Sequence, residues 1–155
     1  MKANQEKTTV KDLSYLIQTS CLRADIGLSL EMLAEKICSS DHYKIYLEDE
    51  AGRLVGVIQA KQIARKILEL TGRKSDEEEM LPTKAYVLNF HTGNDLAEAP
   101  VAVQASTSLR RVLELMEQNS IREIPVVDEA GCLVGTLEAK HILAHYLSAK
   151  VEMAL

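Results

Sequence analysis

The sequence predicts an α+β fold made of two related units, each with the order strand, helix, strand, strand, helix. The first observation is a long internal repeat: residues 50–63 return 79 positions later as residues 129–142, with nine of the fourteen positions identical. The second is that apolar residues in both copies alternate between helical spacing and short strand-like runs. A layer of roughly 50 residues is marginal alone, so we expect the two copies to pack together.

Each element can be assigned in the second copy. Residues 101–103 form a short β-prone run, and Ser106 or Thr107 is expected to cap the following helix. The apolar residues of that helix are Leu109, Val112, Leu113 and Met116, and its end is expected at Asn119-Ser120. Residues 124–127 and 133–137 should pair as a hairpin across a glycine turn. A last helix is expected from Ala139, with a buried face of Ile142, Leu143, Tyr146 and Leu147.

The first copy repeats this plan. Its first helix carries the apolar residues Leu30, Leu33, Ala34 and Ile37. Residues 45–47 and 54–58 are its expected hairpin strands. Its final helix, expected from Ala60, carries Ile63, Ile67 and Leu68.

These patterns divide the chain into four parts. They are an N-terminal segment with a short helix (1–20), a first unit (21–70), an acidic linker (71–96) and a second unit (97–150). Val10–Gln18 has the pattern of a short amphipathic helix that packs on the other half. In the linker, the acidic run Asp76–Glu79 is expected to be a solvated loop, and the apolar stretch Tyr86–Phe90 is expected to be ordered.

Composition excludes several classes of protein. A net charge of −5 without a strongly basic segment argues against nucleic-acid binding. No apolar run is long enough to span a bilayer, and the polar residues 1–11 do not form a signal peptide, so a cytoplasmic location is expected. Three cysteines (Cys21, Cys38 and Cys132), without Cys-x-x-Cys spacing, indicate reduced thiols rather than a disulfide framework or a zinc site.

The sequence contains none of the common catalytic motifs, so we expect no enzyme activity. Gly-x-Ser-x-Gly, the Walker glycine loop, Gly-x-Gly-x-x-Gly and the metalloprotease helix are all missing. His141 and His145 lie one helical turn apart, which suits two metal ligands. Two histidines supply only half a zinc site, and ordinary surface or cleft histidines are the favoured interpretation.

The hairpin of the second copy carries a family resemblance. Residues 124–135 (Ile-Pro-Val-Val-Asp-Glu-Ala-Gly-Cys-Leu-Val-Gly), preceded by Ser108-Leu109 and a helix, resemble the CBS domain, the cystathionine β-synthase module. The first copy resembles it more loosely, because Tyr46 stands where the proline usually sits while residues 49–56 keep the hairpin. Together the copies resemble a CBS pair, or Bateman module.

The resemblance implies two β-α-β-β-α units packed through their sheets around a pseudo-twofold axis, with two clefts between them. In the family these clefts often bind adenosine-containing ligands: AMP, ADP, ATP, S-adenosylmethionine or cyclic dinucleotides. Pairs commonly associate again into a flat disc of four units, so the resemblance also implies a homodimer.

The chain departs from the family pattern where the last strand meets the last helix. The family typically places Ser or Thr there, with an Asp three positions later that accepts hydrogen bonds from ribose hydroxyls. Gln59 and Gln62 stand at these positions in the first copy, and Glu138 and His141 in the second. Losing a charge-assisted hydrogen bond costs on the order of 1 kcal/mol, or roughly tenfold in affinity.

Other candidate ligand contacts lie close by. Lys61 and Lys140 occupy matching positions beside helix N-termini. Two interpretations stay open for them: a clamp that binds phosphate, or solvated side chains with no special role. For Arg65 and Lys66, one turn further on, the solvated interpretation is favoured. Tyr46 and Pro125 stand where the family contacts adenine, although core packing explains Pro125 equally well.

Two functional hypotheses follow. The first is a stand-alone regulatory CBS pair that senses an adenosine-containing ligand and signals to an unknown client protein. The alternative is a degenerate pair that binds no nucleotide and serves as a dimerisation or docking scaffold.

Overall fold

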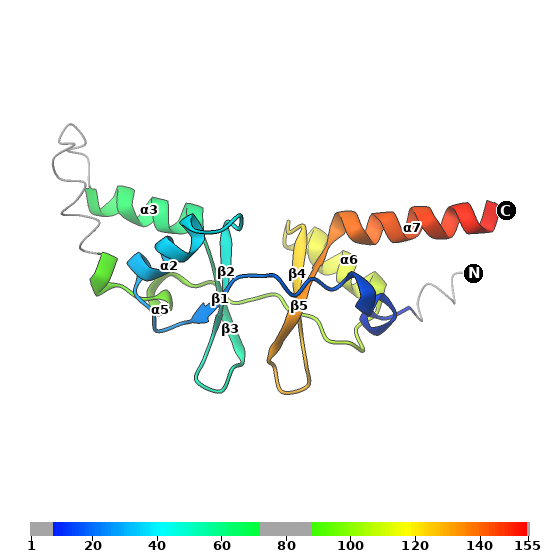
Figure 1. Cartoon of the computed structure of the whole chain (residues 1–155), viewed down its shortest axis with the longest axis horizontal. Coiled ribbons are helices and arrows are strands. Elements are labelled where there is room, and N and C mark those ends of the chain that lie inside the picture. Colours follow the sequence, from blue (N-terminus) through cyan, green and yellow to red (C-terminus); the bar gives the residue numbers. More distant parts are fainter. Residues whose placement is uncertain (1–7, 72–87, 155) are drawn as a thin grey trace. The chain divides into compact units, whose positions relative to one another are not determined.

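The computed structural model describes residues 8–71 and 88–154, which divide into two compact units (Figure 1). The first-copy unit comprises Cys21–Pro100. The second-copy unit joins the N-terminal residues up to Ser20 to the chain from Val101 onward. Each unit packs helices against a small sheet, which confirms the predicted α+β class.

The first-copy unit follows the predicted order of elements. It contains β1 (Arg23–Asp25), α2 (Leu30–Cys38), β2 (Lys44–Glu48), β3 (Leu54–Gln59) and α3 (Ala60–Thr71), followed by the short helices η3 (Leu88–Phe90) and α5 (Gly93–Leu96). Its sheet has the order β1-β2-β3, with β1 parallel and β3 antiparallel to β2. The core consists of Leu30, Leu33, Ile37, Ile45, Leu47, Ile58, Ile63 and Leu88.

The second-copy unit repeats this plan with a smaller sheet. It contains η1 (Val10–Leu16), α6 (Leu109–Gln118), β4 (Glu123–Val127), β5 (Leu133–Glu138) and α7 (Ala139–Ala154). The β-prone run 101–103 forms no strand, because it contributes only an isolated parallel bridge from Val103 to Val126. The core gathers Val10, Leu13, Val103, Leu109, Val112, Met116, Ile124, Val126, Leu137 and Ile142.

Two details of the predicted helices are wrong: the cap of α6 and the extent of the buried face of α7. Ser108, not Ser106 or Thr107, caps α6, because its Oγ accepts a hydrogen bond from the Arg111 backbone N–H at 3.1 Å. Leu143 and Leu147 on α7 remain 60% and 57% exposed, and Leu68 on α3 remains 67% exposed. A two- or three-stranded sheet covers only a narrow stripe of the helix packed on it, so only part of each apolar face is buried.

The repeated hairpin has the same geometry in both units. Asp49 Oδ1 accepts hydrogen bonds from the backbone N–H groups of Ala51 and Arg53, each at 2.9 Å. Asp128 Oδ1 does the same for Ala130 and Cys132, each at 2.9 Å. Gly52 and Gly131 adopt positive φ values of 80° and 87°, which glycine reaches without strain. Identical residues therefore encode identical turns.

The turn around Asp49 gives a prediction about acid stability. Backbone hydrogen bonding from Arg53, supported by the charge and side chain of the same residue, lowers the pKa of Asp49. Because the pKa is depressed in the folded state, the charged carboxylate stabilises the fold above the ordinary value of about 3.9. That contribution should disappear as the pH falls through the lowered folded-state pKa. The Tm of the native protein should therefore exceed that of Asp49→Asn at pH 6, and this difference in Tm should shrink as the pH is lowered to 2. A difference in Tm that does not change with pH would contradict the prediction.

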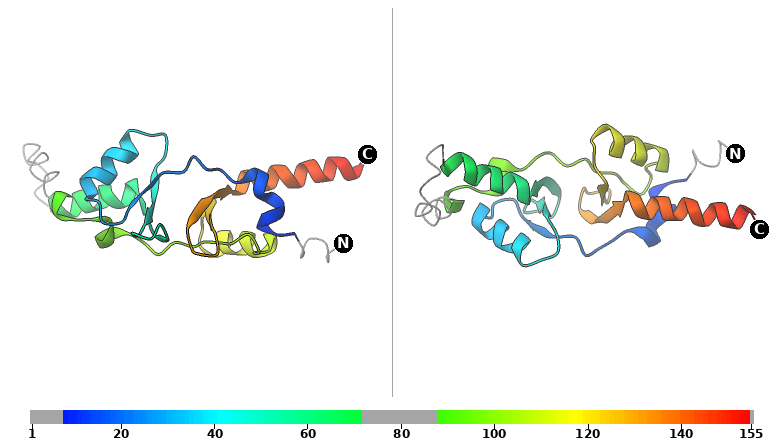
Figure 2. Two further views of the ribbon diagram at one scale, coloured as in Figure 1. Left: turned by 60° about the horizontal axis from the view of Figure 1, so that its bottom comes forward. Right: turned by 90° about the horizontal axis from the view of Figure 1, so that it is seen from above.

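The two units exchange segments in a way that the 79-residue repeat does not show. The N-terminal segment packs on the second-copy unit, and the end of the linker packs on the first-copy unit (Figures 1 and 2). The start of α6 is held by the Leu109 N–H donating to the Thr8 carbonyl, and the start of α2 by the Leu30 N–H donating to the His91 carbonyl, both at 2.8 Å. The two segments thus hold the first helix of each unit in the same way.

A second, shorter repeat underlies this exchange. Thr9-x-x-Asp12-Leu13 corresponds to Thr92-x-x-Asp95-Leu96 at a spacing of 83 residues. In both, the aspartate side chain accepts a hydrogen bond from the threonine backbone N–H, at 2.9 and 2.7 Å. Each segment then adds one strand-like bridge to its sheet: Gln18 exchanges two backbone hydrogen bonds with Thr136, and Glu98 does so with Val57.

Part of the linker lies outside the described residues. This applies to the acidic run Asp76–Glu79 and to Tyr86 and Val87. Leu88 is buried in the first-copy core, as the apolar pattern predicts, whereas Phe90 is largely exposed.

Candidate functional site

The candidate site of the first-copy unit lies where β3 ends and α3 begins. Gln59 is the last residue of β3, and Gln62 lies in the first turn of α3. The Gln59 backbone N–H donates a hydrogen bond to Gln62 Oε1 at 2.6 Å, so the two predicted residues are in direct contact. This bond uses one acceptor position of the half-buried Gln62 amide oxygen and leaves the NH₂ group available as a donor.

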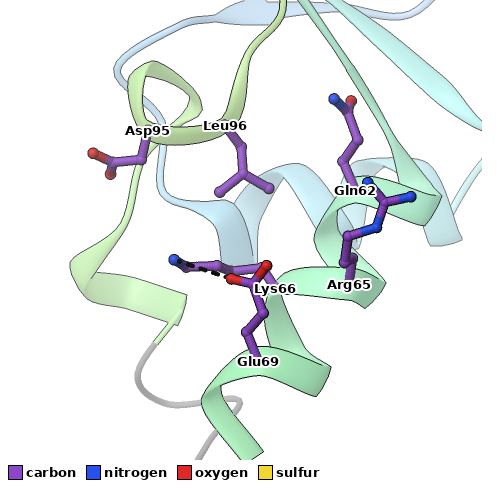
Figure 3. Close-up of a pocket in the computed structure, with 6 residues that line it drawn as sticks. All are labelled: Gln62, Arg65, Lys66, Glu69, Asp95 and Leu96. Atoms are coloured by element: carbon purple, nitrogen blue, oxygen red, sulfur yellow. Dashed lines mark ion pairs between the residues drawn. The ribbon is translucent and has the colours of Figure 1, made fainter.

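A pocket of about 290 Å³ opens beside Gln62 (Figure 3). It is lined by Gln62, Arg65, Lys66, Glu69, Asp95 and Leu96, so α3 forms one wall and α5 the other. The Lys66 Nζ lies 3.7 Å from Glu69 Oε2. The Asp95 Oδ2 atom accepts the Thr92 backbone N–H at 2.7 Å and lies 3.8 Å from His91 Nδ1.

The pocket brings one predicted residue together with two cations for which the sequence favours the solvated interpretation. Arg65, which is exposed, and Lys66, which is half-buried, both line the pocket with Gln62. Asp95 and Leu96 were not predicted as site residues at all. The Thr-x-x-Asp-Leu repeat is the sequence signal that places their segment against the first-copy unit.

The corresponding junction of the second-copy unit is built differently. His141 Nδ1 lies 3.1 Å from Gln18 Nε2, which makes Nδ1 the acceptor, and His141 Nε2 lies 3.9 Å from Glu138 Oε2. One turn later, the His145 Nδ1 atom contacts the Tyr15 hydroxyl. Both histidines are therefore engaged by the N-terminal segment, an arrangement that the i, i+4 spacing does not reveal.

The described residues hold no group of three or more histidine, cysteine, aspartate or glutamate side chains suited to a metal ion. Glu138 and His141 are brought together, but His145 contacts tyrosine side chains instead.

The remaining predicted residues do not line the pocket. Lys61 and Lys140 are exposed in the first turns of α3 and α7, and neither lines it. Tyr46 is buried in β2, with the Lys44 Nζ 5.5 Å from its ring centroid. Pro125 is buried in β4, and its carbonyl accepts the Val103 backbone N–H at 3.0 Å.

The described helices include none that is both long and apolar enough to cross a membrane.

A comparison with known protein families finds a match to the second copy. Residues 94–148 match the family model of the CBS domain. The match begins inside α5, so its first residues belong to the first-copy unit and the rest belong to the second-copy unit.

Solved CBS pairs share the fold. The CBS-pair protein CBSX2 from Arabidopsis thaliana is 25% identical, with 92% of this chain and 96% of that chain covered and a TM-score of 0.69; another structure of CBSX2 is of its complex with AMP. The CBS domain pair of protein MJ0100, in complex with methylthioadenosine and S-adenosyl-L-methionine, is 20% identical over 92% and 98% of the two chains, with a TM-score of 0.62.

The cytosolic domain of the Mg²⁺ channel MgtE, in complex with ATP, is 22% identical with a TM-score of 0.65. The match covers 92% of this chain but spans only half the length of that chain.

Proposed function

Because the chain contains a CBS domain at residues 94–148 and has the fold of a CBS-domain pair, we propose that it is a regulatory module that senses an adenosine-containing ligand. It signals by a conformational or oligomeric change to a client protein and catalyses no reaction itself. In this proposal the module is a cytoplasmic homodimer. The observation that carries the proposal is the fold shared with CBS pairs whose structures hold AMP or S-adenosyl-L-methionine.

The proposed mechanism is a population shift. A ligand that binds one conformation of the protein better than another raises the population of the better-binding conformation. The shift in the equilibrium between the two conformations cannot exceed the ratio of the ligand's affinities for them. A client that recognises only one conformation then responds to the ligand concentration. No covalent chemistry is needed, which fits a sequence without a catalytic motif.

A thermal-shift assay tests the proposal. We expect one of AMP, ADP, ATP, S-adenosylmethionine or a cyclic dinucleotide to raise the Tm by several degrees. At a hundred times its dissociation constant, a ligand adds about 2.7 kcal/mol to the free energy of unfolding. Adenine and ribose at the same concentrations serve as controls. If the whole panel leaves the Tm unmoved, the proposal of an adenosine sensor fails.

The alternative function, a dimerisation or docking scaffold, is favoured by a different observation. Gln62 and His141 stand where the family's ribose-binding aspartate is expected, and each has an acceptor atom already engaged within its own unit. The exposed Leu143 and Leu147, four residues apart on α7, offer an apolar stripe to a partner. A scaffold would show a stable dimer in sedimentation that Leu143→Glu disrupts, with no ligand response.

A further inference from the structure

We propose that the pocket beside α3 is an anion site for a phosphate-bearing ligand, and that the described part of the second-copy unit forms no equivalent site, so each chain binds one such group. The inference rests on the proposed function, because it selects phosphorylated compounds among adenosine-containing ligands and assigns their phosphates to Gln62 and Arg65.

The hydrogen bonding of Gln62 determines what it recognises. A ribose hydroxyl donates to the aspartate of the family pattern, whereas the Gln62 oxygen carries no charge and already accepts one hydrogen bond, from the Gln59 N–H at 2.6 Å. The NH₂ group of Gln62 can only donate. The side chain is therefore better suited to a group with several acceptor atoms, such as a phosphate, than to a donating ribose hydroxyl.

The other groups of the pocket add donors on the same helix face. Arg65 lies three residues after Gln62, and Figure 3 shows the two side chains on the same side of the view, while Lys66 extends to the opposite side, where the segment with Asp95 and Leu96 lies. The two carboxylates have local partners: Glu69 pairs with Lys66, and Asp95 accepts the Thr92 N–H. The guanidinium of Arg65 presents several N–H donors in a plane that matches phosphate oxygens.

The size of the pocket suits a phosphate group. Its volume of about 290 Å³ lies just below the range for small-molecule sites, roughly 300–1,000 Å³. That volume is ample for a phosphate or diphosphate group.

The second-copy unit lacks the same arrangement for two reasons. Ala144 stands at the position of Arg65 in the repeat, so the principal cation is missing. The N-terminal segment is also longer than its counterpart: six positions separate Asp12 from Gln18, whereas three separate Asp95 from Glu98. The longer segment places Tyr15 against His145 and Gln18 against His141, the residues equivalent to Lys66 and Gln62.

Isothermal titration of the full chain with ATP, pyrophosphate and adenosine tests the inference. We expect ATP and pyrophosphate to bind with one site per chain, and adenosine to bind at least about tenfold more weakly than ATP. Gln62→Glu should lower the affinity for both anions at least about tenfold, because its carboxylate keeps the hydrogen bond from the Gln59 N–H but repels phosphate. Arg65→Gln should have a similar effect. Arg110→Gln, which removes an exposed arginine from α6, is the charge-matched control and should bind as the native chain does.

The outcomes separate the inference from the proposed function. Binding of ATP that is unaffected by Gln62→Glu and Arg65→Gln, or that shows two sites per chain, overturns the inference and leaves the sensor proposal standing. Binding of pyrophosphate as tight as that of ATP, and lost in both variants, supports the anion site but identifies a free inorganic phosphate compound rather than an adenosine ligand. If neither anion binds, the inference fails. The sensor proposal then depends only on whether adenosine or S-adenosylmethionine binds the chain.

Discussion

Removing residues 1–20 will unfold the second-copy unit and leave the first-copy unit folded. Val10 and Leu13 are fully buried in the second-copy core, and burying each side chain stabilises the unit by about 1.5–3 kcal/mol. The same segment holds the start of α6 through Thr8 and pairs with β5 through Gln18. Small domains have only about 0.05–0.15 kcal/mol of stability per residue, so a unit of this size cannot lose these contacts and remain folded.

Hydrogen exchange measured residue by residue checks this prediction. Amides of β4, β5 and α6 should lose protection in the truncated chain, whereas those of β2 and β3 should keep it. A synthetic peptide of residues 1–20 should restore protection when added in trans. Leu13→Ala should destabilise the second-copy unit by about 2–5 kcal/mol, while Leu147→Ala, at an exposed site, should have little effect. Equal loss of protection in both units would show that the segment does not belong to one unit alone.

Gly135→Ala will destabilise the second-copy unit strongly. A Cβ atom at this position would lie 2.5 Å from both the Gln18 carbonyl oxygen and the Ile17 Cγ2 atom. The carbonyl cannot move away without breaking its hydrogen bond from the Thr136 N–H, which is 2.9 Å long. Overpacking of this kind costs about 1–3 kcal/mol of stability. If the N-terminal segment were displaced, the unit would also lose the stabilisation from the buried side chains of that segment.

Denaturant unfolding of three glycine variants tests whether the steric clash of the new Cβ atom causes the loss of stability. Gly56→Ala should cost less than Gly135→Ala, because its new Cβ would meet the Ala97 Cβ at 2.9 Å rather than a fixed backbone oxygen. Gly27→Ala is the matched control, since its Cβ would meet only the Asp25 side chain at 3.0 Å. Equal free energies of unfolding for all three variants would contradict the steric explanation.

Local sequence accounts for the repeated elements of the fold. The Asp49 and Asp128 turns form from residues within four positions of the aspartate, so the same short sequence produces the same hairpin twice. The starts of α3 and α7 at Ala60 and Ala139 also agree with the prediction. The buried faces of these helices were predicted less well, since exposure of Leu68, Leu143 and Leu147 depends on how wide a sheet each helix covers.

The candidate site was only partly predictable. The sequence alone determined two related units that share the order helix, hairpin, helix, and the absence of the family's aspartate from positions 62 and 141. Only the tertiary structure decided that the Gln62 amide oxygen is occupied, that Arg65 and Lys66 share a pocket with Asp95, and that Tyr15 and Gln18 contact the second-copy histidines. The physical reason is the long distance along the sequence between the residues in contact. Gln18 and His141 are 123 positions apart, so no local pattern predicts which surface each connecting segment covers.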